Sequence, residues 1–288
     1  MAVTNFIPDL WSAQLLVALR KRHVAAMACV NRDYEGDIKR QGDSVKITSI
    51  NDVTIGSYTA HSDITVEDID DATRSLLIDQ AKYFAVELDD VEKAQHVKGG
   101  GSPLAQAVDN AGYQLADTVD SFLLDLINDA AEGTATDLGT VAIHTTARNL
   151  YDAFVDLAVV LDQQNVPEIG RYVVISPALH GRLLKLDEFI AAGDAQGADA
   201  RANGRVGEVA GLQVYKSNNL PAVTDAAATG GLAIAGYKGA TTFAEQIVSM
   251  EAARMEKRFA DMVKGLHVYG AKVVRPTGVA KVEFDATA

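Results

Sequence analysis

The chain has 288 residues, of which 48% are hydrophobic, 23% charged and 6% aromatic, a composition that excludes general disorder. Its 39 acidic residues outnumber 26 lysines and arginines, and the formal charge of −13 argues against a nucleic-acid-binding protein with a dominant basic face. A single cysteine excludes a disulfide framework and a cysteine-rich zinc site, and no apolar run approaches the roughly 18 residues of a membrane-spanning helix.

The N-terminal segment predicts a short amphipathic helix. Asp9 can cap it, apolar side chains recur at helical spacing from Trp11 to Leu19, and the basic run 20–22 follows them. This order of charges is the reverse of a signal peptide, so we expect the chain to be made and used in a reducing cytoplasm. The helix either packs on its own domain or docks on a neighbouring subunit, and the sequence leaves both open.

Between Gly42 and Leu88 the pattern changes to strict alternation, which predicts strands near 45–48 and 83–88. The residues between them, 51–74, form a long, acidic and polar excursion. Loops longer than about 12–15 residues are uncommon in compact domains. Strand-like stretches at 53–55 and 64–66 make the excursion a two-stranded flap, and because an isolated hairpin is marginally stable in water, we expect the flap to lie on another surface.

A long helix is the clearest prediction in the chain. The glycines at 99–101 form a hinge, Ser102 and Pro103 provide an N-cap and a first helical residue, and one apolar stripe continues to about Ala131. At about 1.5 Å per residue, the helix is on the order of 40 Å long. Residues 99–147 contain acids but no lysine or arginine, and acids in a last turn oppose the helix dipole. Either water or cations from elsewhere must therefore screen these acids.

The second half predicts a separate α/β unit. Helices are expected over 150–161 and from 177 to near 186, separated by a strand at 172–175. A hairpin at 206–209 and 212–215 and further strands follow, within 232–235, 247–262, 266–274 and 279–284.

No constellation of residues indicates catalysis. Ser176 lies in a strand-to-helix turn that invites a nucleophile interpretation, but the Gly-x-Ser-x-Gly motif is absent and Pro177 makes the serine a helix cap. The six histidines form no paired metal motif, the acidic runs lack the pattern of a calcium loop, and the glycine-rich turns lack that of a phosphate loop. We therefore expect no enzyme activity, no cofactor and no metal. The features that stand out are instead architectural: an N-terminal helical arm, the flap and the long helix. They indicate a subunit of a larger assembly.

Four stretches of the sequence resemble the major capsid proteins of tailed bacteriophages, and they follow the expected order over almost the whole chain. They are NRDYEG at 31–36 with GDSVKI at 42–47, IDQAKYFAVELDDVEKAQ at 78–95, VGEVAGLQVYKSNNLP at 206–221 and VKGLHVYGAKVVRP at 263–276. The resemblance implies an α+β, Hong Kong 97-type capsid fold. Its parts would be an N-terminal arm (1–43), an extended β-hairpin loop (44–82), a peripheral domain with the spine helix (83–147), an α/β axial domain (148–265) and a C-terminal strand returning to the peripheral domain (266–288).

This resemblance also implies a function. The chain would self-assemble into pentamers and hexamers of an icosahedral shell around double-stranded DNA, and it would reside in the virion after assembly in the host bacterial cytoplasm. Its partners would be other copies, a portal, a separate scaffolding protein (because no long N-terminal extension is present) and DNA held by non-specific contact. A decoration protein is left open, and no membrane partner is expected. Two alternatives stay open: an encapsulin-like bacterial compartment with the same fold, and a soluble α/β enzyme.

Two sets of residues are candidates for the contacts of such a shell. The arm and the flap supply the candidates for contacts between subunits, namely Trp11, Leu15, Arg20, Lys21, Arg22, Asp63, Glu67, Asp68, Asp70 and Asp71. The long helix supplies Asp109, Asp117 and Asp120, which would line the interior or meet the cations of a neighbour's arm. Since phosphate affinity comes mainly from lysine and arginine, an acidic lining would let DNA pack densely without adhering.

Overall fold

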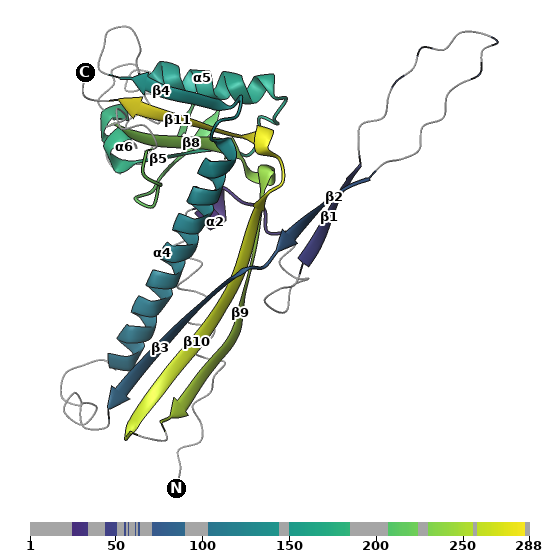
Figure 1. Ribbon diagram of the computed structural model, residues 1–288. Coiled ribbons are helices and arrows are strands. Elements are labelled where there is room, and N and C mark those ends of the chain that lie inside the picture. Colours follow the sequence, from purple (N-terminus) through teal and green to yellow (C-terminus); the bar gives the residue numbers. More distant parts are fainter. Residues whose placement is uncertain are drawn as a thin grey trace.

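The computed structural model describes residues 25–33, 44–50, 55, 57, 61, 63, 71–89, 103–143, 150–184, 207–223, 230–255 and 258–285. Its elements form three parts (Figure 1). A long helix and a three-stranded sheet run side by side and form what we call the rod. A six-stranded sheet with its helices lies at one end of the rod and forms the six-stranded unit. A two-stranded sheet, the flap hairpin, points away from both.

The rod combines helix α4 (Pro103–Ala131) with strands β3 (Gln80–Asp89), β10 (Ala260–Val273) and β9 (Thr241–Arg254). The strands follow the order β3-β10-β9, and both pairings are antiparallel. The predicted helix is confirmed, and it ends before Gly133, whose φ of +67° lies in the left-handed region that favours glycine. One face of β3 packs against α4 in a core that contains Phe84, Val86, Leu88, Val108, Leu115 and Ala116.

The six-stranded unit mixes parallel and antiparallel pairs in the order β4-β11-β8-β5-β7-β6. The pairs β4–β11 and β5–β7 are parallel, and the other pairs are antiparallel. Its strands are β4 (Asp137–Ala142), β5 (Arg171–Ile175), β6 (Glu208–Val209), β7 (Leu212–Lys216), β8 (Gly231–Tyr237) and β11 (Val279–Asp285), and its helices are α5 (Leu150–Gln163) and α6 (Pro177–Leu183). Short 3-10 turns at Lys238–Ala240 and Pro276–Gly278 flank the start of β9 and of β11.

Both faces of this sheet are buried. Val173 and Ile175 of β5 pack into a core with α5 and α6, whereas the alternate residues Tyr172 and Val174 join a core with α4 and the short helix α2 (Ala25–Ala28). A strand that is covered on both faces needs apolar side chains in both directions. This requirement explains why β5 reads as an almost continuous apolar run, and why the sequence predicts it so clearly.

The flap hairpin pairs β1 (Ser44–Ile50) with β2 (Asp71–Leu77) in antiparallel register, and Ile50 lies opposite Asp71. The strand expected near 45–48 is confirmed, but β2 begins inside the stretch expected to be the polar excursion. Within the excursion, the structure also describes Ile55, Ser57, His61 and Asp63, which lie in neither a helix nor a strand. Ile55 belongs to the stretch 53–55, whose sequence is strand-like.

The resemblance implies domain bounds that differ from the bounds of the rod and of the six-stranded unit. It places β4 in the peripheral domain and returns β11 to that domain, yet the two strands pair with each other in the six-stranded unit. It places β9 in the axial domain, yet β9 lies in the rod beside β10. The β4–β11 pairing joins residues far apart in sequence, which no local pattern specifies, whereas β9 and β10 follow each other in the chain and pair as an antiparallel hairpin. The expected N-terminal helix, the glycine hinge and residue 186 lie outside the described residues.

Candidate functional site

Two of the residues predicted at contacts between subunits are described. Asp63 is exposed, and Asp71 is the first residue of β2. Near Asp63 in sequence, the side chain of Ile55 is 96% exposed, which places a large apolar group in solvent on the flap. The other candidates in this set lie outside the described residues: Trp11, Leu15, Arg20, Lys21, Arg22, Glu67, Asp68 and Asp70.

The three acids predicted to line the interior have different environments on α4. Asp109 is exposed and Asp117 is half-buried. Asp120 is only 3% exposed, so the prediction that it faces the interior of a shell is wrong. Its carboxylate instead accepts hydrogen bonds from other residues of the same chain.

Asp120 joins three segments that are distant in sequence. Its Oδ1 accepts a hydrogen bond of 2.7 Å from the backbone N–H of Ala25, at the start of α2. Its Oδ2 accepts from Ser217 Oγ at 3.3 Å and from Asn219 Nδ2 at 3.2 Å, in the segment that follows β7. Asn219 Nδ2 also donates to Asp117 Oδ1 at 2.6 Å. The two aspartates therefore hold the rod, the six-stranded unit and residue 25 together.

The segment 25–33 is built into the body of the protein. Cys29 is fully buried in the core between α4 and the six-stranded sheet. Asn31 forms a parallel bridge with Thr242, and the guanidinium of Arg32 pairs with Glu245 and lies 5.5 Å from the centroid of the Phe243 ring. The described part of the predicted arm is thus anchored at both ends.

Cys29 is a buried core residue. Burial raises the pKa of the Cys29 thiol, and the nearby charge of Asp120 raises this pKa further. Since the thiolate is the reactive form of cysteine, the thiol is unreactive in the folded chain.

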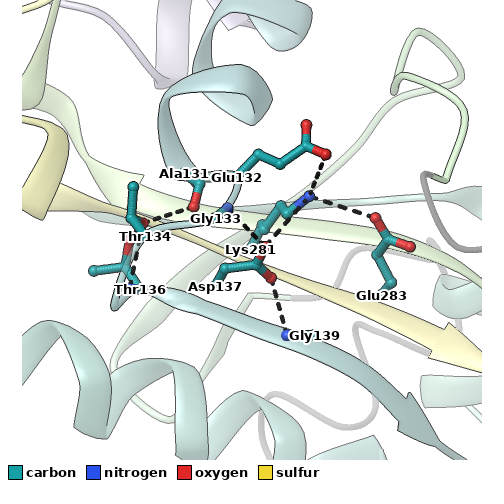
Figure 2. Close-up of polar contacts among 9 residues, drawn as sticks. All are labelled: Ala131, Glu132, Gly133, Thr134, Thr136, Asp137, Gly139, Lys281 and Glu283. Atoms are coloured by element: carbon teal, nitrogen blue, oxygen red, sulfur yellow. Dashed lines mark hydrogen bonds and ion pairs between the residues drawn. The ribbon is translucent and has the colours of Figure 1, made fainter.

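Like the Asp120 contacts, the end of α4 is a joint, a place where side chains hold distant segments of the chain together (Figure 2). The side chain of Lys281, on β11, is 2% exposed, and its Nζ lies 3.5 Å from Glu283 Oε1, 3.6 Å from Asp137 Oδ2 and 4.0 Å from Glu132 Oε1. The carboxylate of Asp137 also accepts hydrogen bonds from the backbone N–H groups of Gly133 (3.1 Å) and Gly139 (2.9 Å).

Lys281 provides a cation for the acidic end of the long helix. The acids near the end of α4 need a cation because a helix carries partial negative charge at its C-terminus. The buried ammonium of β11, far downstream in the chain, supplies that charge. Sequence reasoning missed its role, although a lysine inside the apolar run VAKVEF was a visible signal.

Two exposed acids near the end of α4 repel each other. Partial burial and the charge of Asp129, four residues away, raise the pKa of the Asp125 carboxyl above its usual range. The folded chain therefore disfavours the ionised form, and the stability that this carboxyl contributes below its unfolded-state pKa is lost as the pH rises through its folded-state pKa.

We therefore expect Asp125→Asn to raise the melting temperature of the unassembled subunit by about 1 °C at neutral pH, because it removes a like-charge pair. The difference should disappear below the pKa of about 3.9 of an unperturbed aspartate. Thermal unfolding across this pH range measures both effects. Asp109→Asn is the matched control, because Asp109 has no acid three or four residues away on α4; an equal gain in that variant would contradict the assignment.

The described residues give no sign of catalytic or metal chemistry. Ser176 Oγ accepts a hydrogen bond from the Leu179 backbone N–H at 3.3 Å, so this serine caps α6 as predicted. Within the described ranges, no three His, Cys, Asp or Glu side chains are grouped to hold a metal ion. Among the described helices, none combines the length and apolar character that crossing a membrane requires.

Comparisons with known proteins agree with this architecture. A structure from Mycobacterium phage Che8 is 29% identical to this chain, with a TM-score of 0.67 and 98% of each chain covered. The capsid structure of cyanophage P-SCSP1u is 21% identical, with a TM-score of 0.70, and the match covers 91% of this chain and 87% of that one. A virus-like particle from Pyrococcus furiosus is less similar, with 12% identity, a TM-score of 0.56 and coverage of 96% and 98%, and this likeness shows the fold alone.

No curated protein matches the sequence significantly. The model of the phage capsid protein family matches residues 72–282, which is well over half of the chain. The chain therefore belongs to the phage capsid protein family, and it is a structural major capsid protein with the Hong Kong 97-type fold.

Proposed function

We propose that this chain assembles into pentamers and hexamers that close an icosahedral shell around double-stranded DNA. The observation that carries the proposal is the flap hairpin, whose two strands form a sheet separate from the other two sheets. A two-stranded sheet is marginally stable in water, so the part of the flap hairpin beyond its base, which packs on the rod at Leu76, needs a second surface. A neighbouring copy supplies that surface in a shell, and many such modest contacts add up through multivalency.

The rod and the six-stranded unit have different roles in the proposed shell. The rod acts as the peripheral domain, and the six-stranded unit acts as the axial domain around the centre of each ring. Head-to-tail contacts between identical copies generate closed rings of this type. The candidate residues of the arm and the flap form the contacts between copies. A scaffolding protein and a portal are the further partners of assembly in the host cytoplasm, and a decoration protein binds the finished shell if one is present.

The exposed acids of α4 support an interior lining that repels DNA. Asp109, Asp125 and Asp129 are exposed, and α4 contains no lysine or arginine to offset them. We expect the double variant Asp109→Lys/Asp129→Lys to assemble and to retain DNA more tightly, because each added cation attracts phosphate. The salt concentration that releases DNA from opened particles measures this retention; unchanged release would remove Asp109 and Asp129 from the lining.

Electron microscopy of the full chain, expressed with its neighbouring gene products, tests the proposed function. Closed shells with five- and six-fold rings that contain nucleic acid are the expected result. Shells that contain protein cargo instead would favour the encapsulin-like alternative, which shares the fold seen in the Pyrococcus furiosus particle. A chain that stays monomeric at every concentration would contradict both.

A further inference from the structure

The flap hairpin joins the rod through a very short connection. β2 ends at Leu77 and β3 begins at Gln80, so Ile78 and Asp79 alone link two strands that belong to different sheets. The ladder between β3 and β10 ends at the same point, because its last pair is Gln80 with Tyr269. We call residues 76–79 the elbow.

The side chains of the elbow pack into the rod. Leu76 and Ile78 are fully buried in a small core with Ala244 and Val268, whereas Leu77 between them is 52% exposed. Two buried side chains on one side of an extended segment resist rotation of that segment, because any rotation withdraws both from the core. The elbow is therefore held by packing and not only by the chain connection.

Gly270 lets the elbow approach β10 closely. A Cβ added at Gly270 would collide with the carbonyl oxygen of Leu77 and lie 2.9 Å from the Cα of Ile78. These atoms belong to the backbone, so they cannot move aside as a flexible side chain does. Any larger residue at position 270 must push the elbow away from the rod.

Two cations fasten the base of the flap hairpin to β10 and the residue that follows it. The guanidinium of Arg74, on β2, donates a hydrogen bond to the carbonyl oxygen of Val274, just beyond the end of β10. The ammonium of Lys272, on β10, donates to the carbonyl oxygen of Ser75 on β2 at 2.9 Å. The contacts are reciprocal, because each segment sends one side chain to the backbone of the other.

We infer that Arg74, Gly270 and Lys272 are positioning residues that set the direction in which the flap leaves the rod, and so the place where it meets a neighbouring copy. This inference rests on the proposed function, in which the flap contacts a second copy. The seven residues of β2 span on the order of 20 Å at about 3.3 Å per residue, so a rotation of roughly 10° at the elbow moves the far end of the strand by roughly 3–4 Å. A displacement of that size breaks a packed contact.

The double variant Arg74→Ala/Lys272→Ala tests the inference without touching the buried core. We expect its unassembled subunit to melt within about 2 °C of the wild type, because neither side chain is buried. We expect at least a roughly tenfold loss of uniform closed shells in electron micrographs, with irregular or open particles in their place, because the flap loses its fixed direction. Lys272→Arg in the wild-type background should retain uniform shells, because it keeps a donor at this position.

Lys264→Ala is the matched control, since Lys264 is an exposed lysine of the same strand that pairs with Glu251 away from the elbow. It should form uniform shells. Gly270→Ala should reproduce the shell defect of the double variant, with faster hydrogen exchange at residues 74–79. Uniform shells from the double variant at the wild-type frequency would overturn the inference. Absence of shells from the wild-type chain would instead overturn the proposed function.

Discussion

Replacing Lys281 with methionine is expected to lower the free energy of unfolding of the subunit by about 3–5 kcal/mol. The lysine is 2% exposed, and its ammonium lies within 4.0 Å of the carboxylates of Glu132, Asp137 and Glu283. Methionine fills a similar volume but leaves these carboxylates without their cation at the end of α4. Denaturant unfolding of the unassembled subunit at neutral pH measures the loss.

Two further variants separate charge from packing at this joint. Lys281→Met/Glu283→Gln should recover part of the lost stability, because it also removes the most buried of the three carboxylates. Lys264→Met, at an exposed ion pair with Glu251, should cost no more than about 1 kcal/mol. A loss below about 1 kcal/mol in Lys281→Met would show that the buried cation does not stabilise the joint.

The second large effect is expected at Asp120. Asp120→Ala removes the acceptor of three hydrogen bonds, from the Ala25 N–H, Ser217 Oγ and Asn219 Nδ2. A buried donor that loses its acceptor costs about 1–3 kcal/mol, so we expect a total loss of about 3 kcal/mol in unfolding free energy. Hydrogen exchange at the Ala25 amide should accelerate as well, because this amide loses its partner.

Asp109→Ala is the control for this prediction, because Asp109 is exposed on the same helix. It should change the unfolding free energy by no more than about 0.5 kcal/mol. Asp120→Asn should fall between the two, since its amide keeps one oxygen that can accept from Ala25. Equal stabilities for Asp120→Ala and Asp109→Ala would mean that Asp120 does not join the three segments.

Local signals in the sequence predict the elements that depend on local physics. The apolar stripe and Pro103 predict α4, the Ser176–Pro177 pair predicts the start of α6, and the apolar run of β5 predicts a buried strand. Each signal involves residues within a few positions of one another, because helix periodicity, capping and strand burial are properties of short segments.

The β4–β11 pairing, the contacts of Asp120 and the elbow depend on residues far apart in sequence, and no local pattern predicts them. β4 pairs with β11 across the whole second half of the chain, so nothing near either strand identifies its partner. Asp120 has the same side chain as the exposed Asp109, and only the approach of Ala25 and Asn219 makes it a buried acceptor. The elbow likewise requires β10 to pass beside residues 76–79, which only the folded chain brings about.

In the proposed shell, residues 51–70, which connect the two strands of the flap hairpin, pack on a neighbouring copy, and this contact closes the particle. The most direct test replaces residues 51–70 with Asn-Gly, a two-residue turn that preserves the pairing of Ile50 with Asp71. Electron microscopy of this variant, beside the full chain under the same conditions, should show folded subunits that form no closed shells. Closed shells of normal size and number from the shortened chain would contradict the role of the flap.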